Sequence, residues 1–253
     1  MRLVVYTALF GDQDYLWSVP PSLAERATYI VFTEKPRKEV GLWGSSLHSQ
    51  YPTIIRGTWK DSPSTPTWQQ RIVKATYGNQ RSARYYKMMS HKVLPNADIS
   101  IWVDANVRLL CLPRKAVKYW LGNGNLAAFN HPNRKCLYDE AAECLRRGKG
   151  CVERMTGQVQ TYRKAGMPRD WGLAETKCVI RRNTPAITEL NNAWWSEIQN
   201  FSARDQVSLP FVCWTQNKRW QVIPGRAGIP SFPGELNKAF WFIKHLRKRK
   251  RHA

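Results

Sequence analysis

Short apolar runs alternate along the chain with segments that have helical periodicity. The runs Leu3–Leu9 and Ile99–Val103 are mostly apolar, and polar residues follow each of them. Runs of this kind are typical of strands buried on both faces of a sheet. No small-residue cleavage site follows the first run, so we interpret it as a strand rather than as a signal peptide.

The same reasoning places the other elements. Strands are expected at residues 29–33, 126–129, 178–180 and 221–223, and helices at residues 68–93, 185–200 and 206–214. Residues 62–66 contain two prolines and are expected to form a loop. The alternation of strands and helices predicts an α/β fold with a mostly parallel central sheet flanked by helices.

Chain length favours one domain. A chain of 253 residues with 43% hydrophobic residues can bury a core of its own. We expect residues 1–235 to form a single domain and residues 236–253 to form a basic C-terminal helix or tail. No stretch of the sequence approaches the roughly 18 consecutive apolar residues that a membrane helix needs.

The chain is strongly basic. It contains 40 Lys and Arg residues against 18 Asp and Glu residues, a formal net charge of +22. Such a field attracts polyanions, such as nucleotide phosphates, nucleic acid, acidic glycans or an anionic membrane surface. The alternative is a solvated basic face that only aids solubility. The six cysteines lack the spacing of a zinc site, so we expect reduced thiols and a cytoplasmic location.

Polar residues follow four of the predicted strands. They lie at residues 10–14, 32–34, 104–106 and 130–134. In α/β sheets ligands bind beyond the carboxyl ends of the parallel strands. We therefore expect these four segments to form one ligand-binding rim.

Two features at this rim suggest phosphate chemistry. Asp104 and Asn106 follow a strand at positions i and i+2, and their oxygen atoms suit Mg²⁺ or Mn²⁺. An Asx turn that closes the strand explains the same residues. Arg81, Arg84 and Lys87 recur every third residue and so share a helix face that could meet a diphosphate. A solvated basic face remains the alternative.

Two acidic residues are candidates for catalysis. Asp205 lies at the predicted start of a helix, where it could cap the helix or face a substrate. Glu175 precedes a predicted strand and is, by itself, no different from a surface residue. The sequence has no GxGxxG, Walker A, HExxH or GxSxG motif, so dehydrogenases, P-loop kinases, zincins and α/β-hydrolases lack their usual support.

Many short motifs in one order give the chain a family resemblance. They are Tyr6-Thr7-Ala8, Phe10-Gly11-Asp12, Phe32-Thr33, Arg81/Arg84/Lys87, His91, Trp102 to Asn106, His131-Pro132-x-Arg134, Glu140, Gly172-Leu173, Arg181-Arg182, Trp194-Trp195 and Arg204-Asp205-Gln206. Over about residues 3–212 the chain resembles the glycosyltransferase-like domain family once catalogued as DUF616, which includes plant cell-wall mucilage proteins. That family is similar to GT-A glycosyltransferases.

The resemblance implies a GT-A-like, Rossmann-like domain that binds a nucleotide-sugar donor with a divalent cation, Mn²⁺ or Mg²⁺. It implies metal-binding roles for Asp104 and Asn106, and Asp205-Gln206 resembles the pair that lines the sugar pocket in several GT-A families. In a transferase, Asp205 or Glu175 would be the catalytic residue that positions or deprotonates the acceptor hydroxyl. Asn106 departs from the usual DxD motif, and a neutral amide binds a divalent ion less tightly than a carboxylate does. Weak, donor-dependent metal binding and metal-free binding of the diphosphate by Arg84 and Lys87 are therefore both open. The residues expected to bind the donor are Thr7, Phe10, Gly11, Asp12, Arg81, Arg84, Lys87, Asp104, Asn106, His131, Arg134 and Gln206.

Three functions follow as hypotheses. The leading one is a glycosyltransferase that moves a sugar from a nucleotide-diphosphate sugar to an acceptor hydroxyl, with a polyanionic glycan or modified nucleic acid as acceptor. The second is a nucleic-acid-binding protein on a degenerate transferase scaffold, suggested by the basic charge and the interleaved aromatic residues. The third is a ceramidase-like hydrolase, because some plant relatives are described as alkaline ceramidases.

Overall fold

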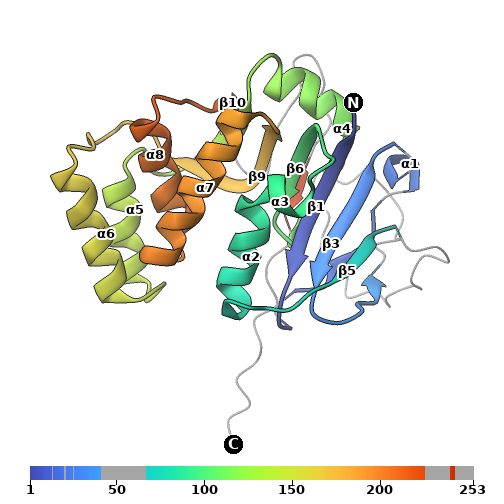
Figure 1. Cartoon of the computed structure of the whole chain (residues 1–253), viewed down its shortest axis with the longest axis horizontal. Coiled ribbons are helices and arrows are strands. Elements are labelled where there is room, and N and C mark those ends of the chain that lie inside the picture. Colours follow the sequence, from blue (N-terminus) through green and yellow to red (C-terminus); the bar gives the residue numbers. More distant parts are fainter. Residues whose placement is uncertain (13, 20, 25, 41–66, 226–239, 243–253) are drawn as a thin grey trace, which may run out of the picture.

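The structure is a computed structural model that describes all residues except 13, 20, 25, 41–66, 226–239 and 243–253. Its central sheet has seven strands in the order β10-β8-β9-β6-β1-β3-β5 (Figure 1). The strands are β1 (Leu3–Leu9), β3 (Thr28–Thr33), β5 (Gln69–Ile72), β6 (Ile99–Val103), β8 (Leu126–Asn130), β9 (Ala174–Arg182) and β10 (Gln221–Ile223).

The sheet is parallel except at one strand. β1 pairs in parallel with β3 and β6, and β3 pairs in parallel with β5, as β10 does with β8. β9 lies antiparallel between β6 and β8. The predicted α/β class, with a mostly parallel sheet flanked by helices, is therefore confirmed.

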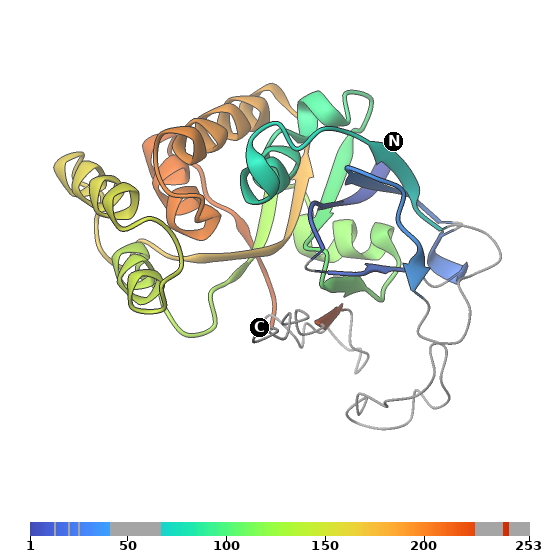
Figure 2. The same ribbon diagram turned by 90° about the horizontal axis from the view of Figure 1, so that it is seen from below.

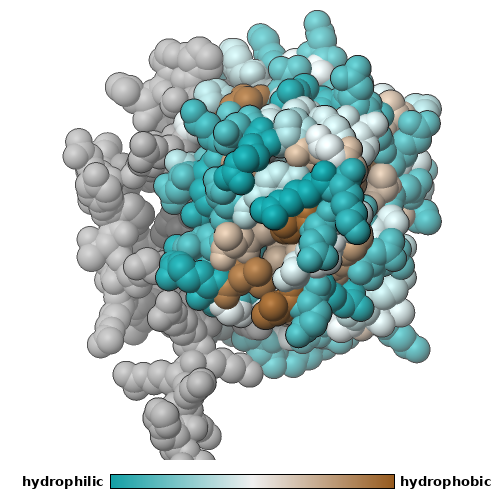
Figure 3. Space-filling view, turned by 90° about the vertical axis from the view of Figure 1, so that its left-hand side faces the viewer, coloured by the Kyte–Doolittle hydropathy of each residue, from teal (hydrophilic) through white to brown (hydrophobic). Residues whose placement is uncertain are grey.

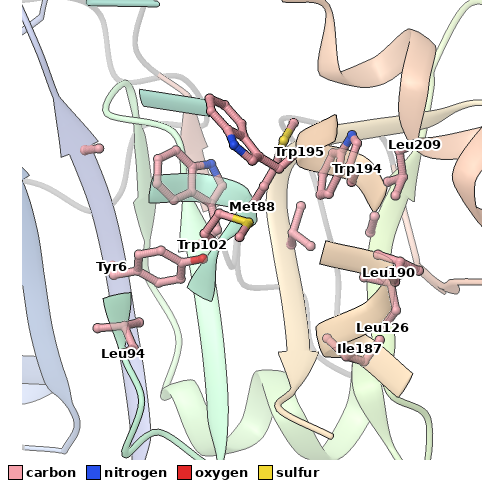
Figure 4. Packing of buried hydrophobic residues seen from close by; sticks show 14 of the residues in the cluster. Tyr6, Met88, Leu94, Trp102, Leu126, Ile187, Leu190, Trp194, Trp195 and Leu209 are labelled. Atoms are coloured by element: carbon pink, nitrogen blue, oxygen red, sulfur yellow. The ribbon is translucent and has the colours of Figure 1, made fainter. Parts of the chain in front are cut away.

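Helices cover both faces of the sheet, because both faces of β1 and β6 are apolar. One face packs against the short helices α1 (Pro21–Ala24) and α4 (Pro113–Ala116) and the π-helix Val117–Leu121. The other packs against α2 (Gly78–Met88), α3 (Ser90–Val93), α7 (Pro185–Asn200) and α8 (Asp205–Thr215). Figure 4 shows this second core, in which Tyr6, Met88 and Trp102 lie between the sheet and α2.

Two more helices extend the second layer away from the sheet. They are α5 (Leu137–Arg146) and α6 (Val152–Lys164), and they form a third core with Leu173 and Val207. Seen from below, α7 and α8 lie between the sheet and this pair (Figure 2). Figure 3 shows this end of the molecule, which is mostly hydrophilic with a limited group of hydrophobic side chains.

Two small sheets lie beside the central one. β2 (Leu16–Trp17) pairs in parallel with β4 (Glu39–Val40), and β7 (Val107–Leu109) pairs antiparallel with β11 (Phe240–Phe242). Of the predicted C-terminal segment 236–253, only β11 lies within the described residues. The predicted loop at residues 62–66 lies outside them. The boundary at residue 235 stays a prediction.

Most predicted elements are present. The predicted strands at Leu3–Leu9, Ile99–Val103 and Gln221–Ile223 and the helix Pro185–Asn200 have the expected bounds. The single helix expected at residues 68–93 is wrong in its first part, because Gln69–Ile72 forms edge strand β5 beside β3. From Gly78 onward the segment forms α2 and α3, which are separated by Met89.

A buried arginine ties α2 to the sheet. The Arg181 side chain on β9 has 0% exposure, and its guanidinium donates to the carbonyl oxygens of Lys87 and Met88 at the end of α2. It also donates to the side chains of Tyr6 and Asn191. A cation suits this place, because the carbonyl groups at a helix C-terminus carry partial negative charge. Burial lowers the pKa of Arg181.

We expect Arg181→Ala to lower the free energy of unfolding by on the order of 3 kcal/mol, because several buried acceptors lose a charged donor. Urea denaturation measures this change. The matched control is Arg182→Ala, which removes a hydrogen bond from the next side chain to the carbonyl oxygen of Gly122. That bond is exposed, so its loss should cost less than about 1 kcal/mol. Equal effects of the two substitutions would contradict the role of Arg181.

Candidate functional site

The predicted rim exists. The parallel strands β1, β3, β6 and β8 end at the same edge of the sheet, and β9 begins there. The described residues of segments 10–14, 32–34, 104–106 and 130–134 therefore lie at one edge of the sheet, as predicted, and ligand binding there stays a prediction. The backbone N–H of Gly11, after β1, donates to the Glu34 carboxylate, after β3, at 3.3 Å.

The centre of this rim is a buried lysine. The Lys87 side chain has 1% exposure, and its Nζ lies 3.3 Å from Asp104 Oδ1, 3.1 Å from Thr176 Oγ1 and 2.5 Å from Asp205 Oδ2. These four residues belong to α2, β9, α8 and the end of β6. We call them, together with Arg84, the lysine centre.

Arg84 and Asp205 complete the lysine centre. The Nε of Arg84, one turn before Lys87 on α2, lies 3.3 Å from Asp205 Oδ1. The two carboxylate oxygens of Asp205 thus face two different cations. Asp205 is the first residue of α8, and its carboxylate also accepts a hydrogen bond from Thr176 at 2.7 Å. These contacts, rather than a helix cap, account for the acid at this position.

The surroundings of Asp205 keep it ionised. Burial is the largest single influence and opposes the charged form, but the charges of Arg84 and Lys87 and the hydrogen bonds from Lys87 and Thr176 together outweigh it and lower the pKa of this carboxyl well below its usual value. A carboxylate with so low a pKa binds protons weakly. Its charge holds the two cations in place.

Asp104 has a second partner inside the core. The indole N–H of Trp102 donates to Asp104 Oδ1 at 2.7 Å, the same oxygen that faces Lys87. Asn106, the second predicted metal ligand, is buried, with 6% exposure. Among the described residues no three His, Cys, Asp or Glu side chains form a cluster suited to a metal. Asp104 Oδ1 is already paired with the Lys87 ammonium, and this arrangement does not fit a divalent ion beside the same carboxylate, so the metal role of Asp104 and Asn106 stays a prediction.

The sequence reasoning missed Thr176. This threonine lies where the register between β8 and β9 shifts between Ala128 and Phe129. A bulge of this kind redirects side chains, and here it accompanies the turn of the Thr176 hydroxyl toward Lys87. Thr176 lies between the charged residues Glu175 and Lys177, so the sequence pattern does not single it out, and the bulge itself leaves no signal in the sequence.

His131 and Arg134 lie in a different cluster from Lys87. Arg134 Nε donates to Glu140 Oε2 at 2.6 Å, and His131 Nε2 lies 3.6 Å from the same oxygen. Burial lowers the pKa of His131, and Glu140 acts in the opposite direction. Arg204, next to Asp205, lies 4.0 Å from Glu140. Glu175 is buried and forms an ion pair with Lys177 at 2.6 Å.

Other predicted donor-binding residues have local partners. Arg81 donates to the carbonyl oxygens of Ile198 and Phe201 at the end of α7, away from the lysine centre. Asp12 forms exposed ion pairs with Lys35 and Arg37. Phe10 is buried and its ring packs against Tyr86. Gln206 follows Asp205 in the first turn of α8.

Gly11 meets a conformational need. Its φ of +69° is in the left-handed region, and a Cβ there would lie 2.5 Å from the side-chain nitrogen of Asn79. Only glycine takes this conformation without strain. The turn that follows β1 therefore depends on Gly11.

A small cavity opens beside the lysine centre on the other face of the sheet. Thr7 of β1 lines it, and its hydroxyl is buried without a hydrogen-bond partner in the described part of the chain. Tyr29 of β3 lines the same cavity, and its hydroxyl is also buried without a hydrogen-bond partner among the described residues. The cavity also reaches Asp104 and Arg108, so a ligand there would adjoin the end of β6.

The family described as "TOD1/MUCI70, glycosyltransferase-like domain" matches residues 1–223. The chain belongs to this family. The match confirms the family resemblance inferred from the motifs. Residues 1–223 thus form a glycosyltransferase-like domain.

Two curated relatives come from Arabidopsis thaliana. "Probable hexosyltransferase MUCI70" is 25% identical over 143 residues, which are 53% of this chain and 25% of the relative. "Alkaline ceramidase TOD1" is 27% identical over 137 residues, which are 50% of this chain and 30% of the relative. The chain thus matches less than a third of the length of either relative.

A solved structure is also similar. Mouse xyloside xylosyltransferase 1 matches with a TM-score of 0.42 and 8% identity, over 87% of this chain and 84% of the mouse chain.

Within the described residues, no helix has both the length and the apolar character needed to span a membrane.

We expect Asp205→Asn to lower the free energy of unfolding by about 3 kcal/mol at pH 7, because it leaves Arg84 and Lys87 without their buried counter-ion. The pKa of Asp205 is lowered by folding, so its contribution is fully present above the unfolded value of about 3.9 and is lost as the pH falls toward the folded value. The stability difference between the two proteins should narrow below about pH 4 in urea denaturation.

The control for this pH dependence is Asp139→Asn. Asp139 has 51% exposure and pairs with the exposed Arg169, so its replacement should change stability by less than about 1 kcal/mol at any pH. If the difference in free energy of unfolding between the wild type and Asp205→Asn stays constant from pH 7 to pH 3, the charge of Asp205 is not the source of its stabilising effect.

Proposed function

We propose that this chain is a glycosyltransferase that moves a sugar from a nucleotide-diphosphate sugar to an acceptor hydroxyl. The observation that carries the proposal is the lysine centre at the end of β6, where fixed cations face the rim of the sheet. Preorganised positive charge is what a departing diphosphate needs, because negative charge develops on it as the sugar leaves. The family match supports the same chemistry.

Arg84 is the residue proposed to contact the diphosphate directly. Its contacts with Asp205 and with the carbonyl oxygen of Ala203 both use Nε. The side chain keeps 18% exposure, so its two terminal nitrogens can turn toward the rim. The planar guanidinium then offers two parallel donors to phosphate oxygens.

At the anomeric carbon the transfer breaks one bond and forms another, and the acceptor's proton moves to a base. The bond between the anomeric carbon and the β-phosphate oxygen breaks, and its electron pair leaves with the nucleoside diphosphate. The acceptor hydroxyl oxygen forms the new bond to the anomeric carbon and gives up its proton. We propose that Thr7, two residues before the end of β1, binds the nucleoside part through its unpartnered hydroxyl in the cavity that reaches Asp104.

The two predicted catalytic carboxylates receive different proposed roles. Asp205 binds protons weakly, because its pKa is far below the usual value, so we assign it the positioning of Arg84 and Lys87. Glu175 precedes Thr176 of the lysine centre and remains the proposed recipient of the acceptor's proton. His131 and Arg134 remain proposed donor-binding residues at the end of β8.

The net charge of +22 supports a polyanionic glycan as the acceptor. A nucleic-acid acceptor has no support from the family or the relatives, and we do not propose it. The relative named as a ceramidase raises hydrolysis as a second activity. Metal-activated hydrolysis needs a full ligand set, and the described residues hold no cluster of three suitable side chains.

A screen of nucleotide sugars for hydrolysis and transfer tests the proposal. With the active donor, Arg84→Met should lower kcat/KM by about a hundredfold, because the donor to the leaving diphosphate is lost. Lys92→Met is the control, since Lys92 is an exposed residue of α3 outside the lysine centre, and it should retain the wild-type rate. A wild-type kcat/KM for Arg84→Met would contradict the assignment of Arg84 to the leaving diphosphate.

A further inference from the structure

We propose that the Lys87 ammonium serves as the resident cation of the site, in the place where a divalent metal ion was expected, so that the diphosphate binds without a metal. The donor part of this inference rests on the proposed function. The part that concerns the metal depends only on the contacts of Lys87, Asp104 and Asp205.

The first argument is that the ammonium is fully coordinated. An ammonium has three N–H donors, and Lys87 Nζ has three oxygen partners at 2.5–3.3 Å, on Asp104, Thr176 and Asp205. Nζ also lies over the Trp102 ring, 5.6 Å from the ring centroid, and this cation–π contact stabilises the positive charge further. Three oxygen atoms from three elements therefore surround one positive charge.

The second argument concerns charge. The lysine centre contains two cations, Arg84 and Lys87, and two carboxylates, Asp104 and Asp205, so its formal charge is already balanced. A divalent ion bound to Asp104 would have to lie within a few ångström of the buried ammonium, because Lys87 and the ion would share one carboxylate. Like charges at such a distance repel strongly where little water screens them.

The third argument is that Lys87 is held in place from its backbone. Its carbonyl oxygen accepts hydrogen bonds from the Tyr6 hydroxyl, at 2.9 Å, and from the Arg181 guanidinium. The end of α2 is thereby fixed on the sheet before any ligand arrives. A cation that needs no rearrangement is well suited to stabilise a developing negative charge.

Together these points separate the roles of the two cations. Lys87 has 1% side-chain exposure and supplies fixed charge beneath the rim, while Arg84 has 18% exposure and supplies donors at its surface. Asp104 has 25% exposure and stays accessible to ligand hydroxyl groups. The chain then needs no divalent ion to hold a nucleoside diphosphate.

The test is a titration of the full chain with Mn²⁺, followed by electron paramagnetic resonance and without nucleotide. The wild-type protein should bind no Mn²⁺ at the lysine centre. Lys87→Ala removes the ammonium and leaves the oxygen atoms of Asp104, Thr176 and Asp205 around one vacated position, so this variant should gain Mn²⁺ affinity by at least about tenfold. Lys92→Ala should match the wild type.

Calorimetry with UDP and with GDP gives the second measurement and does not depend on any variant. The affinity for the nucleotide that binds should change by less than about threefold between EDTA and millimolar Mn²⁺. A loss of about tenfold or more in EDTA, or tight Mn²⁺ binding by the wild type, would overturn the inference. Failure to bind either nucleotide under both conditions would instead count against the proposed function.

Discussion

The burial of one positive charge organises this molecule. Lys87 is withdrawn from water, and an unpaired ammonium in that position would be prohibitively unstable. Its partners come from β6, β9 and α8, which are far apart in the sequence, so these elements must meet for the charge to be neutralised. The same requirement places two carboxylates and a hydroxyl at the edge of the sheet where ligands bind in α/β proteins.

The arrangement around the charge is layered. Arg181 and Tyr6 fix the backbone of α2 beneath the site, and Asp205 links the two cations of that helix. Arg181, Tyr6 and Asp205, none of which is proposed to contact a ligand, thus determine the positions of Arg84 and Lys87. Buried supporting residues of this kind keep the positions of the site's side chains fixed, although the most exposed of these side chains lie at the rim of the sheet.

Much of this was available from the sequence. Buried strands such as Leu3–Leu9 and Ile99–Val103 are read from uninterrupted apolar runs, and Asp104 follows from the end of such a run. The three-residue spacing of Arg84 and Lys87 placed both on one helix face, and the structure brings both to Asp205. Arg81 shares that spacing but lies one turn earlier, where it meets the end of α7 instead.

What the sequence could not predict depends on contacts between distant segments. Gln69–Ile72 is mostly polar and becomes a strand only because the edge of β3 is available to it. Thr176 contacts Lys87 where the β8–β9 register shifts, and His131 lies in a cluster set by Glu140 of α5, a helix that the sequence pattern did not predict. Pairing register and helix docking are tertiary effects that override local pattern.

The most direct measurement is a crystal structure of the chain with the nucleoside diphosphate bound. The account predicts phosphate oxygens about 3 Å from the terminal nitrogens of Arg84, at the end of β6, with Lys87 still between Asp104 and Asp205. A nucleotide bound away from β6, or a Lys87 side chain expelled by a metal ion that bridges Asp104 and the diphosphate, would contradict it.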